Sequence, residues 1–163
     1  MTTGAPIQYI VGDALQPIGT GTKIVAHIVN DRAAQWGAGF GLAVAKKWPL
    51  VQSNFARWAS HHPESFALGA FRLTPVKRGL IVAQMICQKG YGPSKHQRLQ
   101  YDKLSCCLGS LAHYAKSLNA SVHMPRIGTG WAGGSWSAVV QLINSRLTRR
   151  GILVYVYDLP RKR

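Results

Sequence analysis

Two glycine-rich turns constrain the fold of this chain more than any other feature of its sequence. The first, Gly37-Ala-Gly-Phe-Gly41, separates a nearly all-apolar run at 23–29 from a helical stretch that continues to about Trp48. The second, Gly128-Thr-Gly-Trp-Ala-Gly-Gly134, follows a β-rich run at 121–127 and precedes another helical stretch. A nearly continuous apolar run is typical of a strand that is covered on both faces. This order of elements predicts a layered α/β domain with a largely parallel or mixed sheet.

The rest of the chain continues the same alternation. Further strands are expected at 7–11, 67–75, 79–88 and 152–157, and further helices from Pro49 onward, at 99–119, and between Ser135 and Gly151. Proline suits the first residue of a helix, whereas serine and glycine suit its N-cap and C-cap. The length of 163 residues favours one domain, 1–163, with a basic tail at 160–163.

Both glycine turns are suited to holding a phosphate group. Glycines let backbone N–H groups approach phosphate oxygens without interference from a Cβ, and the dipole of the following helix favours an anion there. Gly128, Gly130 and Gly133 also match the dinucleotide fingerprint of Rossmann enzymes. That fingerprint normally opens the first βαβ unit, whereas only 30 residues follow Gly133 here. We therefore expect a different way of holding a diphosphate, although tight turns without a ligand remain an alternative.

The charge balance favours an anionic partner. The chain has 20 Lys and Arg but five Asp and Glu, which gives a formal net charge of +15. Such a surface attracts nucleic acid or phosphorylated ligands, although it is also compatible with a basic protein of weak nonspecific affinity. The candidate basic face consists of Lys46, Lys47, Lys77, Arg78, Arg146, Arg149, Arg150 and the tail. Any carboxylate that acts as a general base must be Asp13, Asp31, Glu64, Asp102 or Asp158.

Several other classes of protein are disfavoured by the sequence. The first residues lack a basic region followed by an apolar one, and no run of about 18 apolar residues is present, so no signal peptide or membrane span is expected. Cys87, Cys106 and Cys107 form neither a disulfide framework nor a metal-binding pair, and we expect them to be buried, reduced thiols. His61, His62 and His96 have no metal-ligand spacing. These features favour a cytoplasmic protein that is monomeric and holds no metal or cofactor.

Four segments carry a resemblance to a known family. In this order along the chain they are "YIVGDAL", "IVAHIVND…WGAGFGLAVAKKWP", "VHMPRIGTGWAGGSW" and "ILVYVYDLP". Together they resemble the macrodomains over essentially the whole chain, and most closely the branch that includes the terminal ADP-ribose protein glycohydrolase and its bacterial relatives. The resemblance implies a three-layer α/β/α fold around a mixed, roughly six-stranded sheet. It also implies that ADP-ribose binds in a cleft at the carboxyl edge of that sheet.

The resemblance assigns roles to the matching residues. Asp13, with Ala14 beside it, would accept a hydrogen bond from the adenine amino group, since a carboxylate accepts and does not donate. Asn30 would face the hydroxyls of the distal ribose, the ribose farther from adenine. The first turn would contact the diphosphate and distal ribose through Gly37, Ala38, Gly39 and Phe40. The second would close the other side through Gly128, Thr129, Gly130, Trp131 and Ala132, whereas Tyr157, Asp158 and Leu159 would border the adenosine.

Each of these residues also has a structural interpretation. Asp13 and Asn30 are typical of turns, and Asp158 is equally compatible with the end of a strand. Trp36 and Trp131 would either line the pocket or belong to the core. His27 lies within an apolar run, which favours a hydrogen-bonded core histidine over a catalytic base.

The sequence departs from the branch's best-known glycohydrolase at two positions. That enzyme uses a lysine at the end of the strand written here "VAQMICQK" and an aspartate after the "RIG-x-G" loop. Gln88 and Ala132 occupy these positions here, and neither can serve as a nucleophile or a base. Lys89 comes one residue later and would point away from the site unless a bulge intervenes, because side chains alternate along a strand. A lysine-adduct mechanism is therefore not expected.

Two classes of function remain open. As an enzyme, the chain would hydrolyse mono-ADP-ribose esters on acidic side chains, with Asn30 and the glycine-loop amides orienting ribose and water. As a non-catalytic reader, it would only bind ADP-ribose or ADP-ribosylated proteins. Affinity for nucleic acid or poly-ADP-ribose through the basic face is compatible with either class.

Overall fold

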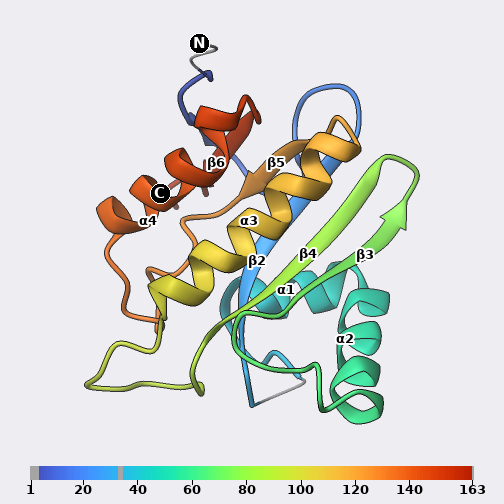
Figure 1. Cartoon of the computed structure of the whole chain (residues 1–163), viewed down its shortest axis with the longest axis vertical. Coiled ribbons are helices and arrows are strands. Elements are labelled where there is room, and N and C mark those ends of the chain that lie inside the picture. Colours follow the sequence, from blue (N-terminus) through green and yellow to red (C-terminus); the bar gives the residue numbers. More distant parts are fainter. Residues whose placement is uncertain (1–3, 33–34, 163) are drawn as a thin grey trace.

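A six-stranded mixed sheet forms the centre of the computed structural model, which describes residues 4–32 and 35–162 (Figure 1). The strands lie in the order β1-β6-β5-β2-β4-β3. All neighbours are parallel except β3, which is antiparallel to β4. The strands are β1 (Gln8–Val11), β2 (Lys23–Asn30), β3 (Phe71–Lys77), β4 (Leu80–Gln88), β5 (Ser121–Met124) and β6 (Val154–Asp158).

Helices cover both faces of the sheet, so the expected three-layer α/β/α architecture is confirmed. They are α1 (Gly39–Lys47), α2 (Pro49–His61), α3 (Tyr101–Ser117) and α4 (Trp136–Arg146), followed by a short 3-10 helix, η1 (Thr148–Arg150). In β2, Ile24 and Ala26 pack in the core beneath α3 and α4, whereas Val25 and Val29 pack beneath α1 and α2. This alternation explains why the strand is apolar on both faces.

The expected elements are present, but several boundaries differ, and three of the differences have a clear local cause. The strand expected at 121–127 ends at Met124, because Pro125 has no N–H to donate to the sheet. The strand expected at 67–75 begins only at Phe71, after a turn in which the N–H of Ala70 binds the carbonyl of Ala67. Helix α3 begins at Tyr101 rather than at 99, because Leu99 forms a β-bridge with Gln88.

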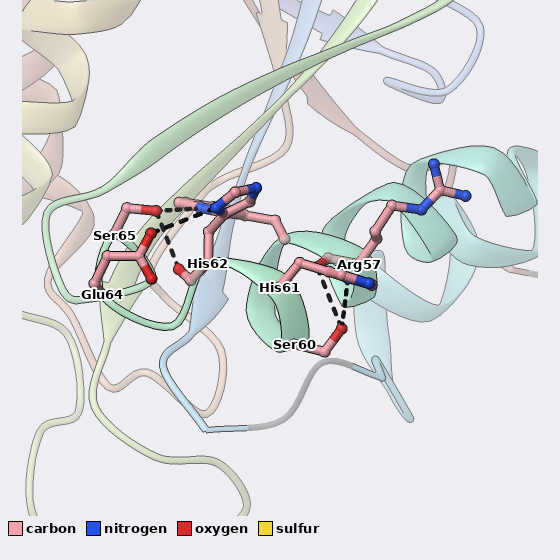
Figure 2. Close-up of polar contacts among 7 residues, drawn as sticks. Arg57, Ser60, His61, His62, Glu64 and Ser65 are labelled. Carbon is pink, nitrogen blue, oxygen red and sulfur yellow. Dashed lines mark hydrogen bonds and ion pairs between the residues drawn. The ribbon is translucent and has the colours of Figure 1, made fainter.

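His61 and His62, at the end of α2, are held by polar contacts with neighbouring residues. In Figure 2 the carbonyl oxygen of Arg57 contacts Nδ1 of His61 at 3.0 Å, and Nδ1 of His62 lies 3.4 Å from a carboxylate oxygen of Glu64. The hydroxyl of Ser65 donates to the carbonyl of His62 and accepts from the indole N–H of Trp58. These contacts close the last turn of the helix onto the segment that leads to β3.

The cysteines are buried only in part, contrary to the sequence-based expectation. Cys87 and Cys107 are buried as expected, but Cys106 is exposed, because adjacent positions on α3 face different directions. Within residues 4–32 and 35–162, no helix is long and apolar enough to cross a membrane.

The aromatic core under α2 gives a test of the fold. Phe55 is fully buried and contacts Trp36, Trp58 and Phe66, with ring centroids 5.0–5.9 Å apart. We predict that Phe55→Ala lowers the free energy of unfolding by about 3–5 kcal/mol, because it removes the ring and leaves a cavity. The control Leu50→Ala, at a position 58% exposed on the same helix, should change it by less than about 0.5 kcal/mol. Urea unfolding of both variants measures this, and equal losses would contradict the packing described.

Candidate functional site

The two glycine turns lie at the same edge of the sheet. We call the edge where the five parallel strands end the carboxyl edge, and the edge where they begin the amino edge. The first turn follows β2 and the second follows β5, and these strands are parallel neighbours. The chain leaves β2 toward the face covered by α1 and leaves β5 toward the face covered by α4. Such a divergence opens the crevice in which α/β sheets bind ligands.

The first turn presents the beginning of α1 to this crevice. Helix α1 starts at Gly39, whose φ is +60°, and its N-cap residue Ala38 provides no side-chain cap. The first turn of the helix holds no acidic residue, so its N–H groups and dipole favour an anion. Asn30 ends β2, and its side-chain oxygen accepts the N–H of Arg32 at 2.9 Å. The interpretation of Asn30 as a turn residue is therefore confirmed, and its role toward ribose stays a prediction.

Backbone hydrogen bonds hold the second turn in place. Gly128 has φ +77°, and its carbonyl accepts the N–H of Gly134 at 2.8 Å. The buried Ala132 accepts the N–H groups of both Arg98 and Leu99 at 2.9 Å. Between them, Gly130 is exposed and Trp131 is 60% exposed. Gly130 and Trp131 are therefore accessible to a ligand, whereas the side chain of Ala132 is not.

A third segment, residues 89–98, completes this side of the crevice, and sequence analysis considered only Lys89 and His96 within it. Asp31 directly follows Asn30, and its Oδ1 accepts the N–H of Gly90 at 2.8 Å. The guanidinium of Arg98 donates to the carbonyls of Lys89 and Gly92 at 3.1 and 2.9 Å. The carboxylate of Asp31 therefore fixes this segment against β2. The sequence signal that could have indicated this contact is the position of Asp31 directly after Asn30.

The far end of the edge holds the residues expected near adenosine. Asp13 follows β1, is half-buried, and accepts the N–H of Leu15 through Oδ1 at 2.9 Å. It thus holds a turn, as the alternative interpretation proposed, and its neighbour Ala14 is buried. Tyr157 is also buried, and its hydroxyl contacts Nδ1 of His123 at 2.7 Å and accepts the N–H of Ile18 at 3.0 Å. Any contact of Tyr157 with a ligand at the edge must therefore involve its backbone.

Asp158 does more than end its strand, because it forms an ion pair with an arginine that sequence analysis did not single out. The guanidinium of Arg126 donates to both carboxylate oxygens of Asp158, at 2.8 and 2.9 Å. The same guanidinium lies 5.2 Å from the ring centroids of both Tyr9 and Trp136. The hydrogen bond from Arg126 lowers the pKa of Asp158 and keeps this carboxylate ionised. Asp158 therefore holds the side chain of Arg126, a residue of the loop that follows β5, in a fixed position.

His27 and Trp36 belong to the core beneath the first turn. Their rings meet edge to face, with centroids 5.0 Å apart, and the ring centroid of Phe40 lies 5.8 Å from that of His27. Neither ring nitrogen of His27 has a hydrogen-bond partner within the described part of the chain, and neither has the indole nitrogen of Trp36. The core assignment of His27 is confirmed, but the expectation of a hydrogen bond was wrong. Burial lowers the pKa of His27 to about 3, so the ring is neutral and too weakly basic to serve as a catalytic base near neutral pH.

The bulge considered for Lys89 is present, but it lies earlier in the strand. Val29 pairs with Ile86 and Asn30 pairs with Gln88, so β4 contains one extra residue at this point. The side-chain amide of Gln88 donates to the carbonyl of Gly90. Lys89 lies beyond the end of β4 and is exposed. Nothing in this arrangement gives Lys89 the role that a strand-end lysine has in the resembling enzyme.

No group of His, Cys, Asp and Glu residues within the described ranges could hold a metal ion. The site at the carboxyl edge offers backbone N–H groups, the amide side chains of Asn30 and Gln88, the guanidinium of Arg126, and carboxylates already engaged in backbone hydrogen bonds or in an ion pair. Such a set can hold an anion and orient a bound group.

Comparisons with known proteins identify the family. No family model matches the chain. A macrodomain protein from Streptomyces coelicolor is 43% identical, and the match covers 93% of this chain and 98% of that one with a TM-score of 0.82. A protein from Bacteroides thetaiotaomicron is 42% identical over 94% of this chain and 99% of that one, with a TM-score of 0.88. The chain therefore belongs to the macrodomain family.

More distant relatives share the fold or a segment of sequence. The mouse (Mus musculus) chromodomain-helicase-DNA-binding protein 1-like is 28% identical over 165 residues, which is 96% of this chain but 18% of that protein. The chain thus spans less than a fifth of this curated relative. Thermosipho africanus DarTG in complex with ADP-ribose is 19% identical over 87% of this chain and 39% of that one, with a TM-score of 0.68. The Oceanobacillus iheyensis macrodomain with ADP is 19% identical, covering 94% and 83%, with the same TM-score.

The packing of the second turn gives a test of its rigidity. A Cβ at Gly134 would overlap Leu99 and lie 2.6 Å from the carbonyl oxygen of Gly128, whereas a Cβ at Gly130 would meet nothing within 4 Å. We predict that Gly134→Ala lowers the free energy of unfolding by about 1–3 kcal/mol through overpacking. Gly130→Ala should leave it within about 0.5 kcal/mol. Chemical denaturation compares the two, and equal stabilities would show that the turn is not held as described.

The buried histidines give a test of pH dependence. Burial lowers the pKa of His27 to about 3 and, together with a smaller effect of Lys23, that of His123 to about 4, from 6.5. Below pH 6.5 the unfolded chain therefore binds protons that the folded chain does not. We predict that the free energy of unfolding falls as the pH drops below 6.5, by up to about 1.4 kcal/mol per pH unit for each histidine.

Urea unfolding at pH 7 and pH 5 measures this dependence. His27→Phe should reduce the loss between the two values, because a neutral ring replaces one of the groups that titrate. The control His113→Gln, at an exposed position, should keep the wild-type dependence. A wild type equally stable at both values, or a His27→Phe variant with an unchanged loss, would contradict the assignment of His27 as a buried neutral ring.

Proposed function

We propose that this chain binds ADP-ribose at the carboxyl edge and hydrolyses esters between mono-ADP-ribose and acidic side chains. One observation carries the proposal: two glycine turns, both open to backbone contacts, follow neighbouring parallel strands at the point where the connections diverge. N–H groups from the two turns can approach one diphosphate from both sides. The solved relatives with ADP-ribose and with ADP support this class of ligand.

The order of the strands indicates which end of the ligand would lie on which side of the crevice. β1 and β6 lie at one side of the diphosphate crevice, and β4 lies at the other, next to β2. Adenosine would therefore lie toward Asp13 and Asp158, and the distal ribose toward Asn30 and the segment 89–98. Trp131, on the second turn, would border the ribose end as an exposed aromatic surface.

Ester hydrolysis makes small chemical demands on this site. The leaving group is a carboxylate with a pKa near 4, so it departs without protonation by an acid. Water would attack the anomeric carbon of the distal ribose as the bond from this carbon to the ester oxygen breaks, so that the bonding electrons leave with the carboxylate and the water's proton passes to solvent. The turns would contribute by orienting the ribose and by stabilising the negative charge on the departing carboxylate. Asn30 would orient the ribose hydroxyls, and Asp31 would act indirectly by holding Gly90 and its segment in place.

The same observations support a second candidate, a non-catalytic reader. Ala132 is buried and carries no functional group, Asp158 is engaged by Arg126, and Lys89 lies beyond the strand. A reader would use the same diphosphate contacts and would lack turnover. The two candidates differ only in whether the bond to the modified side chain is broken.

A label-release experiment separates these candidates. A transferase automodified with labelled ADP-ribose on acidic side chains is incubated with wild type, with Gly130→Glu, and with Asn30→Ala. We predict that wild type releases label and that Gly130→Glu does not. Its affinity for free ADP-ribose in calorimetry should fall by about 100-fold or more, because a carboxylate beside a diphosphate costs several kcal/mol. Asn30→Ala should lower the release rate more than the affinity.

The matched control is Gly109→Glu, on α3, where an added Cβ also meets nothing within 4 Å. It should bind and release like the wild type. Retained label together with tight binding would establish the reader and contradict the hydrolase. Wild-type affinity in Gly130→Glu would contradict the diphosphate site itself.

A further inference from the structure

Two hollows lie at the amino edge of the sheet, opposite the proposed ADP-ribose site. The first has a volume of about 350 Å³ and lies between the β3–β4 hairpin, the end of α1 and the start of β2. The second has a volume of about 520 Å³ and lies between the end of α3 and the starts of β5 and β6. The segment 19–23 separates them and contributes residues to both. This edge is toward the top of Figure 1, where both the β3–β4 hairpin and the end of α3 lie.

The five acidic residues of the chain all lie away from these hollows. Asp13, Asp31 and Asp158 stand at the carboxyl ends of β1, β2 and β6. Asp102 lies in the first turn of α3, which starts next to the end of β4. Glu64 precedes β3, whose first residue pairs near the end of β4. No acid lines either hollow within the described residues, so no carboxylate there offsets the positive charge of this edge.

The first hollow gathers four cations. Lys23, Lys47, Lys77 and Arg78 line it. The ammonium of Lys47 donates to the carbonyl of Leu15 at 2.6 Å and lies 5.3 Å from the ring centroid of Trp48, which fixes its direction. The N–H of Lys23 donates to the carbonyl of Gly79 at 2.9 Å, which ties the start of β2 to the hairpin. The four side chains are therefore carried by a rigid frame.

Favourable interaction with the end of a helix accounts for the position of some of these cations but not of all. Lys47 and Lys116 lie in the last turns of α1 and α3, where a cation offsets the negative end of the helix dipole. Lys77 and Arg78 are exposed at the hairpin and form no salt bridge within the described chain. Lys77 and Arg78 are therefore two cations of the first hollow that neither a helix end nor a salt bridge within the described residues engages, and both can contact an anion from solvent.

We propose that the amino edge binds the phosphate backbone of a polynucleotide at a site separate from the ADP-ribose site. Successive phosphates would lie along the edge, contacting Lys77, Arg78 and Lys23 in the first hollow and Lys116 in the second. The hydroxyls of Thr20, Thr22 and Ser121, with the amide of Asn119, line the second hollow and suit sugars and unpaired bases. Arg149 and Arg150, in η1 before β6, extend the basic line in the same direction.

The shape of this edge favours a polynucleotide over an anionic membrane. A flat lipid surface is bound by basic residues with exposed apolar anchors beside them. The first hollow is concave, and the apolar residues that line it are buried or half-buried. From β6 to β4 the edge spans three strand spacings, roughly 14 Å, which is long enough for several phosphates of one strand. This proposal does not depend on the proposed hydrolase or reader function.

The test is the binding of a fluorescent single-stranded oligonucleotide of 20 thymidines, measured by anisotropy over a range of salt concentrations. Lys77→Glu combined with Arg78→Glu should weaken binding by about tenfold or more and make the slope of log affinity against log salt shallower by about 1.4. The control, Arg161→Glu with Lys162→Glu, makes the same change in net charge beyond β6, at the carboxyl edge. It should lose much less affinity. Free ADP-ribose at saturating concentration should not displace the oligonucleotide.

Other outcomes would overturn the proposal. Equal losses in the two double variants would show that binding follows net charge and has no site. Displacement by ADP-ribose would place the oligonucleotide at the carboxyl edge instead. Tight binding to phosphatidylserine vesicles that the hairpin variant loses, without binding of the oligonucleotide, would assign the edge to a membrane. Lys77→Gln with Arg78→Gln repeats the test with neutral residues, and unfolding curves confirm that each variant is folded.

Discussion

The parallel pairing of β5 with β2 is the constraint on which the rest of this molecule depends. The two strands share one register, and the chain leaves their carboxyl ends toward opposite faces of the sheet. Both glycine turns are therefore brought to one crevice without any side chain having to reach across it. Below them, Leu99 supports Gly128 and Gly134, and Trp36 fills the space that Gly41 leaves open. Core side chains thus determine the shape of the proposed site. This explains how the backbone of the two turns can have a precise geometry although the site contains few functional side chains.

The distribution of charge separates the two edges of the sheet. Three of the five carboxylates lie at the carboxyl edge, and each is engaged: Asp13 and Asp31 accept backbone N–H groups, and Asp158 binds Arg126. Chemistry at this edge must therefore rely on orientation and on N–H donors more than on a free base. The amino edge has hollows lined with cations and no described acid. The two edges of one small domain consequently differ in charge: carboxylates lie at the carboxyl edge, and the described residues that line the hollows of the amino edge include only cations among their charged groups.

Much of this architecture could be predicted from the sequence, since strand periodicity and glycine turns are local signals. The order of elements, the three layers and the shared edge of the two turns followed from them. The details that depend on contacts between distant residues could not. The ion pair of Arg126 with Asp158 joins the loop after β5 to the end of β6, and the bond from Gly90 to Asp31 joins loops 59 positions apart. His27 was expected to find a hydrogen-bond partner, but aromatic rings that only the tertiary fold places there surround it instead. The amino-edge hollows likewise depend on how a hairpin, a helix end and a strand meet.

The most direct measurement of the central claim is a crystal structure of the chain soaked with ADP-ribose. Both turns hold one pyrophosphate in this account, so its oxygens should lie within hydrogen-bond distance of N–H groups from the start of α1 and from the loop at 128–132. The adenine should point toward β1 and β6. Density for the nucleotide at the amino edge, or contacts to a single turn with the other left empty, would contradict the account.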